Sequence, residues 1–294
     1  MSERICVVGA GQMGAGIAQV AAVAGYDVTL VDVSRDQLDR ARSGIERSLG
    51  KLVEKGSVES GAAEAALARI TPAGQPVEAD LAIEAATEDV ALKEQIFQSL
   101  DEAAGDGAIL ASNTSSIPIT RLAAVTSRPD RVVGMHFMNP VPLMPLVELI
   151  RGIDTADETA AYVRAAAERM GKTVAEAHDH PGFISNRILV PMINEAVYCL
   201  MEGVGDRDSI DTVMRLGMNH PMGPLRLADL IGLDTCLFIL DVLHRDLGDD
   251  KYRACPLLRR MVAAGLLGRK SGRGFYDHAP AGGTGGGTGG AAKA

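Results

Sequence analysis

The sequence predicts a parallel α/β domain followed by an all-α domain. Three observations support this fold class. A glycine-rich turn joins a short strand-like run to a helix near the N-terminus, strand-like and helical segments then alternate, and from Phe183 onward apolar residues recur only at helical spacing. With 294 residues, 47% of them hydrophobic, the chain is long enough for two domains. We expect these to span residues 1–182 and 183–278, followed by a flexible glycine-rich tail at 279–294.

Charge and composition argue against several classes of protein. A formal net charge of −9 disfavours nucleic acid or an anionic membrane as a partner. No apolar run approaches the roughly eighteen residues needed to span a bilayer, and a strand-like run begins at once after Glu3, which leaves no room for a signal peptide. We therefore expect a cytoplasmic protein. The four cysteines are far apart, lack metal-ligand spacing and are expected to be buried free thiols.

The glycine-rich turn has the pattern G-x-G-x-x-G and follows a β-branched run at residues 4–8. Gly9 permits the tight turn, Gly11 lets a pyrophosphate approach the backbone, and Gly14 lets the next helix pack closely on the strand. The N-terminus of that helix, expected over about Ala15–Ala24, offers free N–H groups to phosphates. The turn supplies the first cofactor-binding candidates, which are Gly9, Gly11, Gln12, Met13 and Gly14.

A second strand-like run, Val28–Val31, ends in Asp32, where the acid that binds the ribose belongs in this pattern. Together the turn and this acid predict a Rossmann-type NAD-binding domain. An aspartate here accepts hydrogen bonds from the ribose 2′-OH and repels a 2′-phosphate, so NAD is favoured over NADP. Arg35 lies three residues further on and could accommodate a phosphate, which leaves NADP as an alternative.

A long helix is expected over about Arg35–Lys55, and it carries a basic stripe. Arg47, Lys51 and Lys55 recur at i, i+4 and i+8, with Ser48 beside them, so that the four side chains share a face. From the residues alone, a solvated basic face and a site for a second, polyanionic ligand are equally supported.

Further elements are expected as strands at residues 68–71, 81–83 and 108–111 and as a helix at residues 90–100. The last of these strands ends in five consecutive polar residues, Ser112–Ser116. Because ligands bind at the carboxyl edge of an open α/β sheet, this polar run is a candidate binding segment. Helix capping by Ser116 is the alternative, but a cap would not explain the whole run.

His136 and Glu148 form a candidate catalytic pair. His136 lies just after a strand-like run at residues 131–134, and Glu148 lies within a second run at residues 146–150. Adjacent strands could hold the imidazole and the carboxylate side by side. A carboxylate on one ring nitrogen fixes the tautomer and raises the basicity of the other nitrogen, which makes a general base. Taken by itself, the segment is better explained by chance placement of the two residues.

A helix at about residues 156–170 and a strand at 173–177 complete the expected sheet. The polar residues 178–180 are interpreted as a loop before the domain junction and not as a metal site, since no further ligands accompany the two histidines. The helical domain is expected to contain helices at residues 184–202, 206–217, 225–247 and 256–264. The third is apolar over most of its circumference, which suits a core helix or a subunit interface.

Taken together, these residues resemble the short-chain L-3-hydroxyacyl-CoA dehydrogenases, and most of all the branch of that family that acts on 3-hydroxybutyryl-CoA. The shared motifs are, in order, VVGAGQMGAGIA, IEAATED, SNTSS, GMHFMNPVP, LVELI, PGFISNR, HPMGPL and GRKSGRGFY. The resemblance implies an NAD-binding α/β domain, an all-helical domain that forms a homodimer, and an acyl-CoA substrate.

The resemblance also implies roles for individual residues. His136 resembles the catalytic base and Glu148 its carboxylate partner, while Ser115 and Asn186 look like the groups that orient the substrate. Contacts with the dinucleotide fall on Asp32, Glu88, Lys93 and Asn113. Contacts with coenzyme A fall on Ser48 and Lys55, which favours the ligand-binding interpretation of the basic stripe. Lys51 lies on the same stripe and is therefore also a candidate for coenzyme A binding. Many relatives carry a lysine where this chain has Pro145, a departure that removes no catalytic group.

Two other functions are compatible with parts of this pattern. A structural or regulatory NAD-binding protein could keep the glycines and Asp32 but lose His136 or Glu148, and all of these residues are present. A dehydrogenase of another β-hydroxy acid is the closer alternative, although relatives that act on free hydroxy acids generally use a lysine base.

Overall fold

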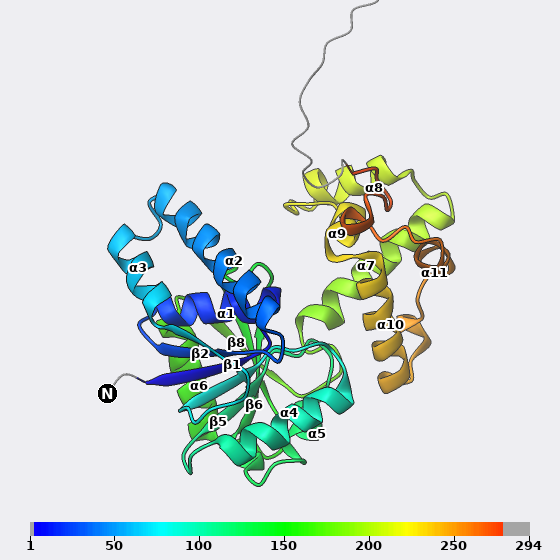
Figure 1. Cartoon of the computed structure of the whole chain (residues 1–294). Coiled ribbons are helices and arrows are strands. Elements are labelled where there is room, and N and C mark those ends of the chain that lie inside the picture. Colours follow the sequence, from blue (N-terminus) through cyan, green and yellow to red (C-terminus); the bar gives the residue numbers. More distant parts are fainter. Residues whose placement is uncertain (1–2, 279–294) are drawn as a thin grey trace, which may run out of the picture. The chain divides into compact units, whose positions relative to one another are not determined.

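The computed structural model of the chain describes residues 3–278 and separates into two compact units, the first ending at Phe183 and the second beginning at Ile184. This division lies one residue after the boundary expected from the sequence. The first unit is a sheet covered by helices and the second contains helices, as Figure 1 shows. The tail at residues 279–294, which we expect to be flexible, lies outside the described residues.

The first unit is built on an eight-stranded sheet with the order β3-β2-β1-β4-β5-β6-β7-β8. The strands are β1 (Arg4–Val8), β2 (Asp27–Val31), β3 (Ile70–Ala73), β4 (Leu81–Glu84), β5 (Ile109–Ser112), β6 (Val132–Phe137), β7 (Leu146–Arg151) and β8 (Thr173–His178). Strands β1 to β6 are parallel, whereas β7 is antiparallel to β6 and parallel to β8. The carboxyl ends of β1 to β6 therefore share one edge, and the Rossmann-type fold class is confirmed.

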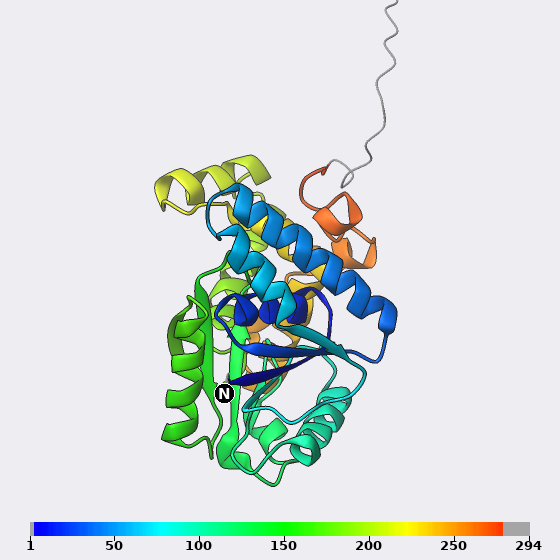
Figure 2. The ribbon, with the colours of Figure 1, turned by 60° about the vertical axis from the view of Figure 1, so that its left-hand side comes forward.

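Helices cover both faces of this sheet (Figure 1, Figure 2). One face packs against α1 (Gln12–Val23), α2 (Arg35–Glu54), α3 (Ser60–Ala68) and α6 (Asp157–Arg169), and the other against α4 (Val90–Ala103) and α5 (Ile119–Ala123). Residues of β1 alternate between the two cores, because successive side chains of a strand point to opposite faces. Ile5 and Val7 join the first core, and Cys6 and Val8 join the second.

Helix α3 was not expected from the sequence. Its segment, SGAAEAALA, is mostly alanine, which has a high helix propensity but gives little contrast between an apolar and a polar face. The strand expected at residues 68–71 begins two residues later, at Ile70. Helices α2 and α3 pack against each other and against α1.

The second unit contains α7 (Ser185–Met201), α8 (Arg207–Thr212), a π-helical turn (Val213–Gly217), α9 (Pro224–Ile231), α10 (Leu233–Leu247) and α11 (Pro256–Ala263). Short 3-10 turns are found at Pro129–Arg131 in the first unit and at Asp250–Tyr252 and Arg269–Ser271 in the second. The single helix expected at residues 225–247 is wrong: it is two helices, separated at Gly232, whose φ of 106° suits glycine. Apolar spacing continues across the break, which hid it from the sequence pattern. No helix among residues 3–278 is both long and apolar enough to cross a membrane.

Candidate active site

The glycine-rich loop follows β1 and leads into the N-terminus of α1. Gly9 has a φ of 102°, a conformation that residues with a side chain rarely adopt. A Cβ atom on Gly14 would lie 1.7 Å from the carbonyl oxygen of Gly9, so no side chain fits there. In contrast, a Cβ atom on Gly11 would meet no atom within 4 Å, so this side of the loop is open. Such a loop fits the diphosphate of a dinucleotide at the N-terminus of a helix.

A cleft of about 590 Å³ lies beside the loop within the first unit, and Gly9, Gly11 and Asp32 line it. The carboxylate of Asp32 accepts hydrogen bonds from the backbone N–H groups of Ala10 and Ser34, both at 2.9 Å. These two bonds fix the carboxylate at the end of β2, at the cleft wall. The lining, which belongs wholly to the described part of the chain, includes no lysine or arginine. A 2′-phosphate at Asp32 would thus meet a carboxylate with no lining cation to offset it, as expected of an NAD site.

Gln12 and Met13, the two consecutive non-glycine residues of the loop, do not line this cleft. Gln12 donates a hydrogen bond through Nε2 to Oδ1 of Asn139 at 3.0 Å. Met13 packs against the hydrophobic core of the sheet. A direct contact with the cofactor by either side chain therefore stays a prediction.

His136 and Glu148 are cross-strand partners in the register of β6 and β7. Nδ1 of His136 lies 2.8 Å from Oε2 of Glu148, and the two residues are 6% and 2% exposed. Nε2 of the same ring lies 3.0 Å from Oγ of Ser115. Because an ionised carboxylate can only accept, Nδ1 carries the ring proton, and Nε2 is left to accept one. The structure therefore brings together three of the four residues expected to be catalytic.

Asn186, the fourth, is the second residue of α7 and belongs to the second unit. Asn113, expected to contact the dinucleotide, lies directly after β5, and its Oδ1 accepts a hydrogen bond from the backbone N–H of Phe137 at 2.8 Å. This bond joins the carboxyl ends of two neighbouring strands next to His136.

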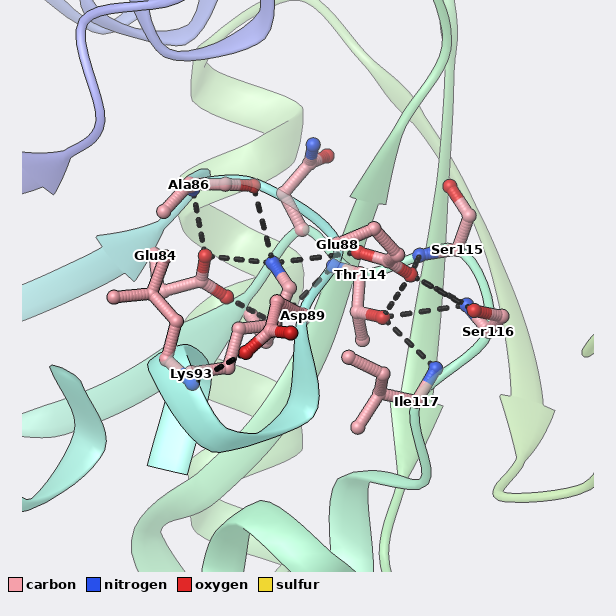
Figure 3. Close-up of polar contacts among 12 residues, drawn as sticks. Glu84, Ala86, Glu88, Asp89, Lys93, Thr114, Ser115, Ser116 and Ile117 are labelled. Atoms are coloured by element: carbon pink, nitrogen blue, oxygen red, sulfur yellow. Dashed lines mark hydrogen bonds and ion pairs between the residues drawn. The ribbon is translucent and has the colours of Figure 1, made fainter. Parts of the chain in front are cut away.

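Glu88 holds the polar turn that follows β5, as Figure 3 shows. Its Oε1 accepts hydrogen bonds from Oγ1 of Thr114 at 2.6 Å, from the N–H of Ser115 at 2.9 Å, and from the N–H and Oγ of Ser116, each at 3.0 Å. Burial by itself raises the pKa of Glu88. The positive charge of Lys93 and these hydrogen bonds outweigh burial, so the pKa lies below its ordinary value of 4.5.

The capping role considered for Ser116 is not what the structure shows. The N-cap residue of α5 is Pro118, and the carboxylate of Asp179 accepts hydrogen bonds from the N–H groups of Ile119 and Thr120 at the start of that helix. The hydroxyl of Ser116 instead belongs to the group of donors around Glu88.

Lys93 lies beneath this turn and does not line the cleft. It is 1% exposed, and its Nζ is 2.6 Å from Oε1 of Glu84 and 3.4 Å from Oε2 of Glu88. The direct contact with the dinucleotide that the resemblance implies would require this side chain to leave its buried position. Glu84 was missing from the candidates, although a carboxylate that ends a strand as apolar as LAIE signals a buried, paired charge.

The coenzyme A candidates lie on or next to α2. Ser48 lines a second pocket of about 280 Å³, between α1, α2 and the loop that starts at Asn139. Lys51 is exposed on the same helix, and Lys55 is its exposed C-cap residue. Ser48 thus faces a cavity, whereas the two lysines are open to solvent.

Lys172 holds the loop between His136 and Glu148. Its Nζ donates hydrogen bonds to the carbonyl oxygens of Val141 at 2.6 Å and Met144 at 2.9 Å. The carbonyl of Pro145, the position where the sequence departs from many relatives, accepts a hydrogen bond from the N–H of Thr173 at 2.6 Å. Lys172, directly before β8, therefore contacts this loop, although residue 145 itself is a proline.

Comparison with known proteins identifies the family of the chain. Two family models match the chain: 3-hydroxyacyl-CoA dehydrogenase, NAD binding domain, over residues 4–180, and 3-hydroxyacyl-CoA dehydrogenase, C-terminal domain, over residues 182–278. A probable 3-hydroxybutyryl-CoA dehydrogenase of Deinococcus radiodurans is 58% identical over 275 residues, which cover 92% of this chain and 99% of that protein.

Solved structures give the same result. The crystal structure of an (S)-3-hydroxybutyryl-CoA dehydrogenase from Ralstonia eutropha has a TM-score of 0.91 and 48% identity, with 95% of this chain and 100% of that chain covered. A diketoreductase has a TM-score of 0.83 and 30% identity, with 95% and 100% covered. The chain therefore belongs to the 3-hydroxyacyl-CoA dehydrogenase family of oxidoreductases, and its first unit is the NAD-binding domain of that family.

Proposed function

We propose that the protein interconverts (S)-3-hydroxyacyl-CoA and 3-oxoacyl-CoA with NAD, and that its substrate is the short-chain 3-hydroxybutyryl-CoA. The observation that carries the proposal is the imidazole of His136, held between Glu148 and Ser115 at the carboxyl end of β6, on the sheet edge that also carries a glycine loop that fits a dinucleotide. The names of the Deinococcus and Ralstonia relatives support the choice of substrate.

In the oxidation, Nε2 of His136 takes the proton of the 3-hydroxyl group while the C3–H bond breaks. The carboxylate of Glu148, 2.8 Å from Nδ1, stabilises the imidazolium that forms. NAD⁺, which the cleft lined by Gly9, Gly11 and Asp32 would hold, would supply the acceptor for the hydride that leaves C3. In the reduction, the imidazolium returns its proton to the alkoxide oxygen.

The hydroxyl of Ser115 lies 3.0 Å from Nε2 and so can hold the substrate oxygen next to the base. From the family resemblance, we assign Asn186 the same orienting role. The resemblance likewise assigns Ser48, Lys51 and Lys55 to coenzyme A, and the pocket beside Ser48 supports this assignment.

Steady-state reduction of 3-oxoacyl-CoAs of four to twelve carbons with NADH and NADPH tests the proposal. We expect acetoacetyl-CoA with NADH to give a high kcat/KM and Asp32→Ala to narrow the preference for NADH. The diketoreductase relative makes a simple dicarbonyl compound the appropriate competitor. If free acetoacetate or a diketone is reduced as efficiently as acetoacetyl-CoA, the proposed substrate class is wrong.

We also infer that the second unit forms a homodimer. The family resemblance is the main support. In addition, Leu230 of α9 and Phe238 of α10 are large apolar side chains that are 48% and 46% exposed and so are available to pack against a second copy of the unit. The cytoplasmic location expected from the sequence stays a prediction.

A further inference from the structure

We propose that Glu84 is a positioning residue for the reaction, because its buried carboxylate holds the turn that places Ser115 against His136. The proposal rests on the proposed function, in which Ser115 and His136 act on the substrate. Glu84 is bonded to neither side chain. It acts through Lys93 and Glu88 (Figure 3) and through Ser112.

The first step of the argument is that Glu84 is anchored and fully buried. It ends β4 and is 0% exposed. Its Oε1 accepts hydrogen bonds from Nζ of Lys93 and the N–H of Ala86, both at 2.6 Å, and its Oε2 accepts one from Oγ of Ser112 at 2.7 Å. A carboxylate removed from water in this way needs such partners, and each partner depends on it in turn.

The second step is that these bonds fix the beginning of the turn. The Ser112 hydroxyl donates its proton to Glu84 and at the same time accepts a hydrogen bond from the N–H of Thr114 at 3.1 Å. The N–H of Asn113 donates to the carbonyl oxygen of Glu84 at 2.7 Å. Three consecutive residues of the turn are thus tied to the end of β4.

The third step is that Lys93 connects the beginning of the turn to its end. The ammonium of Lys93 lies between Oε1 of Glu84 and Oε2 of Glu88. The other oxygen of Glu88 accepts the hydrogen bonds from Thr114, Ser115 and Ser116. Without the charge on Glu84, Glu88 becomes the remaining carboxylate within ion-pair distance of Lys93, and we expect the ammonium to move toward it and displace the turn.

The output of this network is the position of one hydroxyl group. Oγ of Ser115 lies 3.0 Å from Nε2 of His136, and its backbone N–H is one of the groups held by Glu88. A shift of the turn changes that distance without touching His136 or Glu148.

A double-mutant cycle separates positioning from a merely structural role. Glu84→Gln keeps the shape of the side chain and removes its charge. We expect it to lower kcat for acetoacetyl-CoA about three- to thirtyfold, the range over which residues that act through others modulate a site. In a Ser115→Ala background the same change should lower kcat less than about twofold, because two residues that act through one hydroxyl are not additive.

Asp101→Asn is the matched control. Asp101 lies in α4, and its carboxylate holds another turn through the N–H and Oγ of Ser127 and Nε of Arg128. The change removes a charge from a similar network that has no bond to Ser115 or His136. It should lower the melting temperature and leave kcat unchanged in both backgrounds.

Amide hydrogen exchange gives a readout that does not need turnover. The N–H groups of Ser115 and Ser116 donate to Glu88, so their exchange should become faster in Glu84→Gln and stay as in the wild type in Asp101→Asn. If wild-type protein fails to reduce acetoacetyl-CoA, the proposed function is wrong, and this measurement still tests whether Glu84 holds the turn.

Three results would overturn the proposal: an equal loss of kcat in both backgrounds, an unchanged kcat in Glu84→Gln, or no effect of Ser115→Ala itself. If Glu84→Gln does not fold, Ser112→Ala replaces it. That change removes the hydroxyl between Glu84 and Thr114 but leaves Lys93 paired with both carboxylates, and the same criteria apply.

Discussion

At the scale of single residues, the two ring nitrogens of His136 have different partners, and the partners define separate tasks. In the proposed mechanism, the carboxylate of Glu148 on Nδ1 stabilises the charged ring, and the hydroxyl of Ser115 lies at Nε2, the nitrogen that exchanges the proton. Loss of the Glu148 carboxylate should change the free energy of protonating the His136 ring. Loss of the Ser115 hydroxyl should change how well a substrate oxygen is placed.

Glu148→Gln should lower kcat while NADH affinity stays nearly intact, because an amide can still accept from Nδ1 but carries no charge. His136→Gln should lower kcat by at least as much, since general acid–base groups typically contribute about 10²–10⁴-fold. The double variant should be little worse than His136→Gln alone, as expected of residues that act as one unit. Measured kcat values for the three variants decide the point, and strictly additive losses would show that the two residues act independently.

Glu88 gives a prediction about acid stability. Its pKa is lower in the folded protein than its ordinary value of 4.5, so below that pH the unfolded chain binds more protons than the folded one. The stabilisation is present above pH 4.5 and is lost as the pH falls through the folded value. The melting temperature of Glu88→Gln should therefore lie below that of the wild type at pH 6, and the gap should shrink below pH 4.5. A gap that is constant or widens toward acid would contradict the assignment.

At the scale of elements, helix α2 connects the cofactor side of the first unit to the assigned coenzyme A contacts. Its N-terminal part adds Gln37 to the wall of the nucleotide cleft, and its middle adds Ser48 to the second pocket. One helix thus borders both cavities. Changes along it should affect the two ligands separately, according to position.

Lys55→Ala should raise KM for acetoacetyl-CoA severalfold and leave kcat nearly unchanged. The expected reason is the loss of a cation next to the coenzyme A phosphates. The N-acetylcysteamine thioester, which lacks those phosphates, should be affected much less. Arg42→Ala is the matched control on the same helix, since Arg42 is exposed, pairs with Glu46 at 3.3 Å and lies outside the basic stripe. Equal effects of Lys55→Ala on both substrates would mean that the residue acts on folding or catalysis.

The elements also show which parts of the structure the sequence can predict. Strongly periodic segments were placed well: the helix expected at residues 35–55 is α2 at 35–54, and the strand expected at 173–177 is β8 at 173–178. The pattern does not predict alanine-rich α3, because its segment has little contrast between an apolar and a polar face, or the break at Gly232, because apolar spacing continues across it. The positive φ of Gly232 depends on the surrounding fold, so it cannot be predicted from the local sequence.

The site shows the same distinction. The pairing of His136 with Glu148, which two strand-like runs allow and the family resemblance implies, is observed. The roles of Glu84 and Lys93 beneath the turn were not predicted, because burial of a charge depends on which strands become neighbours. The order of the strands is set by long-range packing, which a linear pattern does not contain.

At the scale of the whole molecule, the inferred homodimer can be tested by measuring the mass of the protein in solution. Scattering-coupled gel filtration should give a mass of about twice the 30.8 kDa of the chain. Phe238→Glu should shift that mass toward the monomer, because a charge would replace an exposed apolar side chain of the second unit. Ile153→Glu, a change at an 84% exposed residue of the first unit, is the control and should leave the mass unchanged. A monomeric wild type would disprove the inference.

The reversed direction of β7 has a consequence for how this enzyme can diversify. Because β7 runs antiparallel to β6, Glu148 is the direct cross-strand partner of His136, and the hydrogen-bond ladder sets their separation. A slip of one residue would turn Glu148 to the opposite face of the sheet. The distance between His136 and Glu148 therefore cannot be adjusted in small steps by a change of register. Gradual change must then accumulate elsewhere, in the loops that surround the substrate. A sheet that fixes the His136–Glu148 pair in this way leaves substrate selectivity as the property that can vary continuously.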